Sequence, residues 1–352
     1  MKVVIDISPL QTGHKTRGIG IYTRELSQGL RKVDKINSYI LTTRPHQVKQ
    51  VSLIHYPYFD LFFHTLPIQK RTRTVVTIHD VIPLIFPLWF KPGLRGRFHL
   101  FLQKLALKKV DAVITDSHNS KTDIVKYLKV PADKIHVVHL AVSSEFTKIP
   151  SSRQTQKVRS KYHLPDKYFL YVGDINPHKN LPRLLEAFKN VVNIHPQLNL
   201  VLVSRALSRP ISEANYIKSQ ITDLDLTKQV KLLTTVPLDP LKDLVTIYAA
   251  AEAYIQPSLY EGFGLPVLEA MTAGTPVVCA AVSSLPEIYN HAVVTIDPHS
   301  IHSIASGMNQ ILQLNKTERQ NLIDKAKLQA AKFDWKKTAL ETIKIYQQAI
   351  ND

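Results

Sequence analysis

Short, continuous apolar runs recur along this chain and constrain its fold more than any other feature. The runs are Val3–Ile7, Thr74–Ile78, Ala112–Thr115, Phe169–Val172, Leu198–Val203, Ala253–Gln256 and Val277–Ala280. Apolar residues that follow one another without alternation are typical of strands buried on both faces, as in parallel sheets covered by helices. Amphipathic segments lie between the runs, for example at 181–192 and 241–251. This alternation predicts a doubly wound α/β fold.

The alternation pauses once, in a polar stretch over residues 143–165. We therefore predict two Rossmann-like domains that face a cleft, at residues 1–160 and 161–335. A length of 352 residues suits two domains of ~100–200 residues each. A last amphipathic segment, residues 336–352, follows the second sheet and could pack back on the N-terminal domain.

Composition narrows the class of protein. Apolar residues make up 44% of the chain, which excludes a disordered protein. A lone cysteine, Cys279, excludes a disulfide framework and fits a reducing compartment. No apolar run approaches the ~20 residues of a spanning helix, and the apolar part of Met1–Ile7 is too short for a secretory signal. We expect a cytoplasmic protein.

The most informative segment surrounds Glu261 and Glu269. Gly262 and Gly264 leave the backbone bare just before a predicted helix, whose first amides and dipole form a site for an anion. Carboxylates beside such a site suit a phosphate flanked by hydroxyl groups, because a carboxylate accepts hydrogen bonds from a diol. The plainer alternative is a glycine-rich turn with two solvated glutamates.

The run PSLYEGFGLPVLEAM, residues 257–271, resembles the Glu-x7-Glu signature of the retaining glycosyltransferases of family 4. That family has the two-domain GT-B fold and uses nucleotide-sugar donors. The resemblance implies that Glu261 contacts hydroxyls of the donor sugar and that Glu269 holds the ribose. It also implies that the amides of Phe263, Gly264 and Leu265 meet the sugar and the phosphates.

A second segment, residues 169–188, agrees with this resemblance. Lys179 precedes Asn180, a good helix N-cap, and an ammonium there could neutralise a diphosphate. Taken alone, a lysine at a helix start is usually a solvated surface residue. In this order it resembles the family's Gly-x-x-x-Pro-x-Lys-Asn pyrophosphate element. Many relatives place an arginine where this chain has Asp174, so we suggest Arg205, after another strand, as a substitute.

Two segments in the first half of the chain complete the predicted site. The loop after the first strand contains Arg17, Gly18 and Gly20, and resembles the glycine-rich loop that the family points toward donor and acceptor. His79 and Asp80 stand at the carboxyl end of a strand, where functional groups gather in open α/β sheets. His79 resembles the family's histidine beside the transferred sugar, although a lone histidine is more often structural. The predicted catalytic residues are His79, Lys179 and Glu261, and Arg17 and Asp80 lie on the acceptor side.

No metal site is predicted. Asp223 and Asp225 mimic the Asp-x-Asp motif of a different transferase fold but lie in a polar loop, and no histidine pair has helical ligand spacing beside a glutamate. Lys179 and the helix amides would stabilise the leaving diphosphate, so we expect neither a metal nor another cofactor.

The positive charge of the chain is concentrated in its first half. The net charge is +17, and residues 1–150 hold 23 Lys and Arg against 10 Asp and Glu, whereas residues 151–352 hold 22 against 18. The segment 94–109 predicts a basic amphipathic helix with leucines and phenylalanines on one face. Such a helix either packs on its own sheet or lies on anionic lipid, at the inner face of the membrane. If this excess of positive charge has a function, Lys70, Arg71, Arg95 and Arg97 should share one surface.

We predict a retaining, metal-independent glycosyltransferase that moves a hexose-type sugar from a nucleotide diphosphate sugar to a hydroxyl. The acceptor would be a glycan or a lipid-linked glycan in cell-surface polysaccharide or glycolipid synthesis. Two alternatives stay open: a nucleotide-sugar epimerase of the same fold, and an inactive basic protein that binds membranes or nucleic acid. The aromatic residues lie in apolar runs rather than among Lys and Arg, which argues against a nucleic-acid partner.

Overall fold

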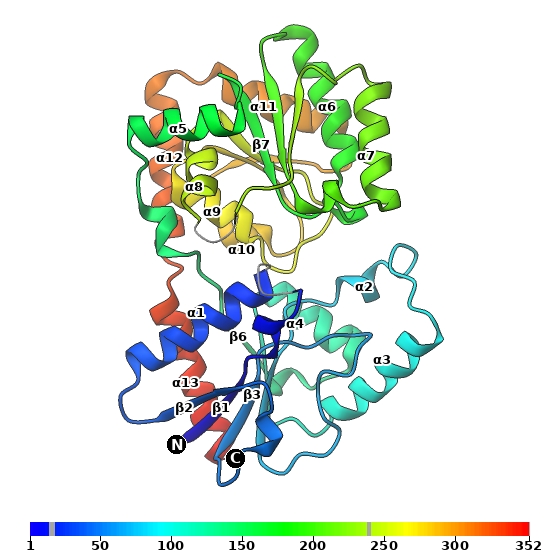
Figure 1. Ribbon diagram of the computed structural model, residues 1–352, viewed down its shortest axis with the longest axis vertical. Helices are drawn as coiled ribbons and strands as arrows, with labels where there is room; N and C mark the ends of the chain where they lie inside the picture. The colour runs from blue at the N-terminus through cyan, green and yellow to red at the C-terminus, as the bar shows by residue number, and fades with distance from the viewer. Residues whose placement is uncertain (14–17, 238–240, 352) are drawn as a thin grey trace. The chain divides into compact units, whose positions relative to one another are not determined.

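The computed structural model describes residues 1–13, 18–237 and 241–351. It divides the chain into two compact units, one made of residues 1–141 and 333–352 and the other of residues 142–332. Each unit has a sheet whose paired strands all run parallel, with helices on both faces (Figure 1). The prediction of two Rossmann-like doubly wound domains is therefore confirmed.

The first unit has six strands in the order β2-β1-β3-β4-β5-β6. The strands are β1 (Lys2–Asp6), β2 (Ser38–Thr42), β3 (Leu53–Tyr56), β4 (Arg73–Thr77), β5 (Ala112–Thr115) and β6 (Ile135–Val137). The helices are α1 (Gly18–Val33), α2 (Ile82–Ile85), α3 (Leu94–Leu107), α4 (His118–Asp123) and α13 (Trp335–Asn351). Alternate strand residues face opposite layers: Val76 joins the core under α3, whereas Thr77 faces α1.

The second unit has six strands in the order β12-β11-β10-β7-β8-β9. The strands are β7 (Tyr168–Val172), β8 (Asn199–Val203), β9 (Val230–Leu233), β10 (Ala253–Gln256), β11 (Val277–Ala280) and β12 (Val294–Ile296). The helices are α5 (Ser152–Tyr162), α6 (Leu181–Ile194), α7 (Ser212–Asp223), α8 (Lys242–Ala249), α9 (Leu265–Ala273), α10 (Leu285–Tyr289), α11 (Ile301–Gln313) and α12 (Lys316–Ala330). One core layer joins α6, α7 and α11 to the sheet.

The boundary between the units differs from the predicted one at residue 160. Helix α5 belongs to the second unit because its polar side chains are tied to α8: Lys161 and Tyr162 both bond Asp243, and Gln154 donates to Thr246. Contacts of this kind between polar residues carry no apolar periodicity, so the sequence does not reveal them.

The C-terminal helix α13 packs in the first unit. Its Tyr346 hydroxyl lies 2.6 Å from His55 Nδ1, and its Thr338 donates to the His139 carbonyl over 2.8 Å. Gly29 of α1 allows a close approach, because a Cβ there would lie 3.3 Å from the Trp335 carbonyl oxygen. Across the described ranges, none of the helices combines the length and apolar character needed to cross a bilayer.

Candidate functional site

The two strands that flank the switch point of the second sheet bring the main predicted residues together. From β7 the chain proceeds to β8 and β9 on one side, then returns to β10 on the other. Ligands in open α/β sheets bind at the carboxyl ends of strands at such a point. Lys179 follows β7 and Glu261 follows β10, so the topology itself places both at this edge.

The buried Glu261 forms an ion pair with the partly buried Lys179. The Lys179 Nζ lies 2.8 Å from both carboxylate oxygens of Glu261. The side chain of Lys179 is 17% exposed and that of Glu261 is 8% exposed. Oε1 also accepts from Gln256 at 2.6 Å and from Ser258 at 2.7 Å. Burial acts to raise the pKa of Glu261, but Lys179, the neighbouring His178 and the hydrogen bond from Ser258 outweigh it and lower that pKa below its usual value. The carboxylate is therefore ionised at neutral pH.

Serines hold the loop that carries Glu261. Ser283 accepts a hydrogen bond from the Glu261 amide at 2.9 Å, and Ser284 donates to the carbonyls of Glu261 and Phe263, each at 2.9 Å. At the helix start, Gly264 adopts φ 112°, and a Cβ there would lie 2.7 Å from a Leu285 methyl group. Both the conformation and the space therefore require glycine. The loop is rigidly connected to α9.

Glu269 stands one turn inside α9, as predicted, and differs from Glu261 in its surroundings. Its Oε2 accepts a hydrogen bond from the Tyr248 hydroxyl at 2.9 Å. Burial raises the pKa of Glu269 to about 7, and the bond from Tyr248 offsets only part of that rise. A carboxyl near half-ionisation at neutral pH can accept or donate a hydrogen bond.

Asn180 occupies the N-cap position of α6 but does not cap it with its side chain, contrary to the sequence prediction. It has a left-handed φ of 61°, and its amide group donates to the carbonyls of Pro257 and Pro298 at 3.0 and 2.8 Å. Asn180 therefore ties the loop after β7 to the loop after β10. Because Lys179 directly precedes Asn180 and Glu261 lies in the loop after β10, this connection holds Lys179 beside Glu261.

Other predicted donor residues lie in different places. Arg205 begins a short 3-10 helix (Arg205–Ser208) after β8 and is exposed. Gly18 and Gly20 lie in the first unit and already belong to the first turn of α1, not to the loop in which they were predicted. Arg17 falls outside the described residues. Gly262 and Phe263 are buried, and Leu265 begins α9 half-buried.

His79 of the first unit lies at the carboxyl end of its sheet, between β4 and β5. Its Nδ1 is 2.7 Å from Asp116 Oδ2, and its Nε2 is 3.2 Å from the Pro57 carbonyl oxygen. Both nitrogens face acceptors, an arrangement that favours the imidazolium ion. Burial acts to lower the pKa of His79, but Asp116 outweighs it and raises that pKa above its usual value. Sequence reasoning missed Asp116, although it directly follows the strand 112–115 as His79 follows its own strand.

A buried polar chain lies beneath His79. The Tyr22 ring meets the His79 ring edge-on at 4.8 Å, and the Tyr22 hydroxyl lies 2.9 Å from Thr77 Oγ1. Thr77 in turn lies 2.8 Å from His55 Nε2. Burial, with the charge of His79 nearby, lowers the pKa of His55 to about 3, so His55 stays neutral. Asp80 instead accepts from the Ile82 amide at 3.0 Å, at the start of α2.

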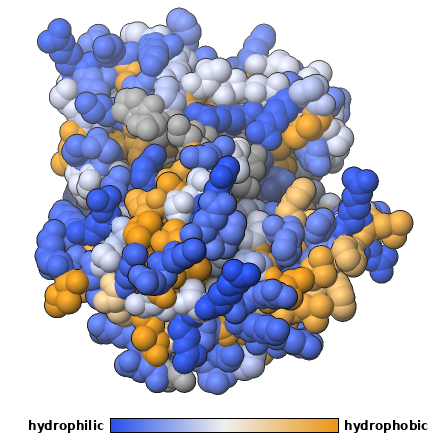
Figure 2. Space-filling model, turned by 60° about the horizontal axis from the view of Figure 1, so that its bottom comes forward, coloured by the Kyte–Doolittle hydropathy of each residue, from blue (hydrophilic) through white to orange (hydrophobic). Residues whose placement is uncertain are grey.

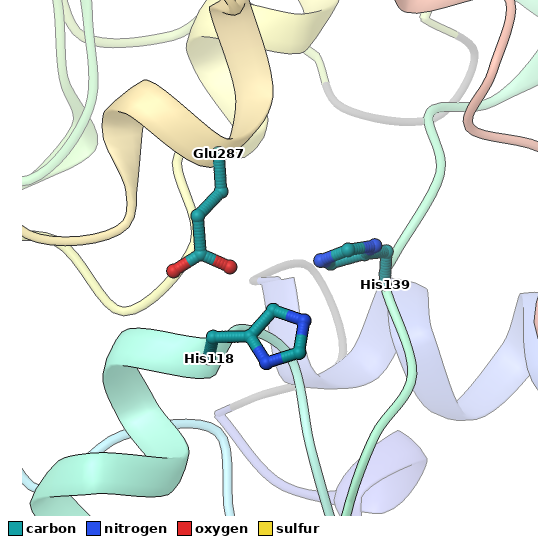
Figure 3. Close-up of side chains that lie close together, drawn as sticks. All are labelled: His118, His139 and Glu287. Carbon is teal, nitrogen blue, oxygen red and sulfur yellow. The ribbon is translucent and has the colours of Figure 1, made fainter.

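A pair of histidines lies elsewhere in the first unit. The rings of His118 and His139 have centroids 6.0 Å apart and planes at 71°. Figure 3 draws these rings, from the start of α4 and from the segment after β6, with Glu287 of α10 in the second unit. Two imidazoles provide half of a tetrahedral metal site. The absence of a metal therefore stays a prediction.

Comparison with known families gives two matches. The family described as "Glycosyl transferases group 1" matches residues 152–329, and the one described as "Glycosyltransferase Family 4" matches residues 38–146. The O-antigen chain mannosyltransferase B of Escherichia coli is 32% identical over 297 residues, which cover 82% of this chain and 75% of that protein. These matches confirm the resemblance found in residues 257–271.

Two further proteins show the extent of the similarity. The serotype-specific mannosyltransferase WbdA of Escherichia coli is 29% identical over 272 residues, which cover 76% of this chain but 32% of that protein. This chain thus spans about a third of its length. The solved structure of the sucrose-phosphate synthase from Thermosynechococcus elongatus superposes with a TM-score of 0.74 at 19% identity, over 99% of this chain and 98% of that one. This likeness supports the GT-B type of fold.

Proposed function

Because this chain belongs to glycosyltransferase family 4, we propose that it transfers a mannosyl or closely related hexosyl unit from a nucleotide diphosphate sugar to a glycan hydroxyl. The relatives include an O-antigen chain mannosyltransferase and a serotype-specific mannosyltransferase, which favours a role in cell-surface polysaccharide synthesis. The observation that carries the proposal is the ion pair of Lys179 and Glu261 at the switch point of the second sheet.

Lys179 is the group that we assign to the donor diphosphate. In the ion pair its ammonium touches both oxygens of Glu261. Phosphate oxygens compete well for an ammonium, so a bound diphosphate would draw Lys179 partly away from Glu261. Charge that develops on the leaving diphosphate would then be stabilised by Lys179 and by the amides of Gly264 and Leu265 at the start of α9, without a metal.

Glu261 is the group that we assign to the sugar. Gln256 and Ser258 both donate to Oε1, and among the described residues Oε2 accepts only from Lys179. When Lys179 turns to the diphosphate, Oε2 becomes an acceptor for a sugar hydroxyl. Glu269, with a pKa raised to about 7 by burial, would bind the ribose hydroxyls more strongly once ionised.

His79, which belongs to the first unit, is the group that we assign to contact with the transferred sugar. Its bond to Asp116 is short, at 2.7 Å, whereas its bond to the Pro57 carbonyl is long, at 3.2 Å. The longer bond is the one that a substrate oxygen could replace. Asp116 would then be a positioning residue that keeps the ring oriented and charged.

Calorimetric titration with a panel of nucleotide diphosphate sugars, including GDP-mannose and UDP-glucose, tests the proposal. One donor should bind at micromolar affinity, and Lys179→Met and Glu261→Gln should each weaken it at least tenfold. Lys218→Met and Glu213→Gln, exposed positions on α7, are matched controls that should leave binding unchanged. Failure of every donor to bind would contradict the proposal.

Product analysis by NMR tests the remaining parts of the proposal. With a glycan acceptor, the product should keep the anomeric configuration of the donor, in the presence of a chelator as well as without one. A donor that is converted without any acceptor would instead indicate an epimerase. A product with the inverted anomeric configuration would contradict the retaining mechanism. Activity that is lost with the chelator and restored by Mg²⁺ would contradict independence from a metal.

A further inference from the structure

Helix α3 turns an apolar stripe to solvent. Leu94, Phe98 and Phe101 are 85%, 60% and 58% exposed. Their spacing of four and three residues places them on one line along the helix, at about 100° per residue. The opposite face is the one that packs on the core, through Gln103, Ala106 and Leu107. The stripe is therefore the outer face of α3, contrary to an ordinary surface helix, which buries its apolar side.

Two neighbouring segments extend this apolar surface. Leu88 and Trp89, shortly before α3, are 79% and 43% exposed, and Phe63 is 68% exposed. The segment of Phe63 adjoins the first turn of α3, because a Cβ on Gly96 would lie 3.5 Å from the Phe62 Cβ. On the right side of Figure 2, where α3 lies in Figure 1, hydrophobic atoms gather among hydrophilic ones. Large exposed patches of this kind mark interaction sites.

The surroundings of the stripe are strongly basic. Residues 61–110 contain nine Lys and Arg but one acidic residue, Asp80. Arg95 and Arg97 are exposed between the residues of the stripe, and Lys108 is exposed just beyond the end of α3. Helical geometry puts Arg97 and Lys108 on one flank of the stripe and Arg95 on the other. An apolar line between basic flanks is the pattern of a helix that lies on anionic lipid.

Lys70 does not share this surface, although the charge pattern suggested it. Its ammonium donates to the carbonyls of Pro67 and Ala106, at the C-terminal end of α3, and burial lowers the pKa of Lys70 to about 8. Ala106 lies on the buried side of α3, opposite the exposed stripe. Lys70 thus has a local structural role.

We propose that this face of the first unit, defined by Phe63, Leu88, Trp89, Leu94, Phe98 and Phe101 with the cations Arg95, Arg97 and Lys108, docks on an anionic lipid bilayer. The apolar side chains enter the boundary between headgroups and acyl chains, and the cations contact lipid phosphates. A second copy of the chain is a poorer occupant, because the same face on both copies would bring two basic rims together.

Sedimentation with vesicles tests the proposal. The protein should bind vesicles of phosphatidylcholine with about one third phosphatidylglycerol, and should bind pure phosphatidylcholine at least tenfold less. Arg95→Glu with Arg97→Glu should weaken binding by about 25-fold or more, since each cation near an anionic surface contributes about fivefold. Phe98→Ser with Phe101→Ser should weaken it at least tenfold even at low salt.

Matched controls separate this face from general charge and hydrophobicity. Lys218→Glu with Lys228→Glu, and Ile194→Ser with Leu328→Ser, change exposed positions of the second unit and should leave vesicle binding unchanged. Vesicles should also shift the tryptophan emission to the blue, and Trp89→Phe should abolish that shift.

Three outcomes would overturn the proposal: equal binding to neutral vesicles, equal losses in the control variants, or a stable dimer that Phe98→Ser with Phe101→Ser dissociates. The last would assign the face to a second copy. None of these results depends on sugar transfer, so the membrane proposal is tested independently of the proposed function.

Discussion

The two units bury opposite charges at the carboxyl ends of their sheets. In the first unit a cation, His79, is held between two oxygen acceptors, Asp116 and the Pro57 carbonyl. In the second unit an anion, Glu261, is surrounded by donors from Lys179, Gln256 and Ser258. The same architecture therefore presents a proton donor from one sheet and an acceptor from the other. The difference lies in the residues that follow each strand.

The largest effect should come from removing the cation of the second unit. Lys179→Met leaves the Glu261 carboxylate buried without its countercharge, and we expect a loss of about 3–5 kcal/mol in the free energy of unfolding. Adding Glu261→Gln to Lys179→Met should recover most of this loss, because no buried charge then remains. Urea denaturation followed by far-UV circular dichroism measures both.

The tryptophans provide an internal reference for that experiment. Trp89 and Trp335 both belong to the first unit, so tryptophan fluorescence follows the unfolding of that unit. A transition that moves in circular dichroism but not in fluorescence would assign the loss to the second unit. If Lys179→Met costs less than about 1 kcal/mol, the pair is not the organising feature of the site.

Glu269 should make the second unit less stable as the pH rises. Burial raises the pKa of Glu269 to about 7 from an ordinary value of 4.5, so the folded state holds this proton more tightly than the unfolded state does. The corresponding stability is complete below pH about 4.5 and is lost as the pH rises through about 7. The change is at most about 3 kcal/mol.

Glu269→Gln should remove this pH dependence, since the amide cannot titrate and its oxygen can still accept from Tyr248. Glu213→Gln, at an exposed position of α7, should leave the pH profile unchanged. Chemical denaturation at a series of pH values checks this. A profile that Glu269→Gln does not alter would contradict the raised pKa.

A smaller effect is expected from Asp116→Asn in the first unit. The substitution removes the charge that raises the pKa of His79, and we expect that pKa to fall below 6.5, with a loss of about 2 kcal/mol in stability. The wild-type contribution is complete below pH about 6.5 and is lost as the pH rises through the higher folded-state pKa. NMR titration of labelled histidine measures the pKa directly.

Asp133→Asn removes an exposed carboxylate from the same unit and should leave the titration of His79 unchanged. A pKa of His79 that Asp116→Asn does not lower would show that the ion pair is not what charges the ring.

Much of the fold follows from the apolar runs. Predicted and observed limits agree for β5, β10 and β11. They differ by one residue at both ends for β1 and β4, and by one residue at the N-terminal end for β7 and β8. The strands β2, β3, β6, β9 and β12 were missed. In β2 the residues are half-buried or exposed, and β6 has only three residues with His136 among them. Strands β2, β6, β9 and β12 lie at sheet edges, where a strand buries too little surface to require an apolar run. The interior strand β3 is short and contains His55.

The candidate site was only partly predictable. Lys179 and Glu261 stand in recognisable local patterns, and their proximity follows from adjacent strands β7 and β10. The partner of His79 was not found, because Asp116 is paired with it across 37 residues and nothing local marks the pair. The left-handed Asn180 was likewise invisible, because two carbonyls distant in sequence accept its amide.

By itself, the sequence determined the class of two parallel sheets covered by helices, most of their interior strands, and the family, because these depend on local hydrophobic periodicity and on motifs a few residues long. Only the tertiary structure decided which ionisable groups are buried together: a Glu261 with a lowered pKa, a Glu269 with its pKa near 7 and a His79 with a raised pKa. It also decided that the apolar stripe of α3 faces outward. The physical reason is that burial and ionisation depend on neighbours brought together by packing, and one residue type can serve opposite roles in different surroundings.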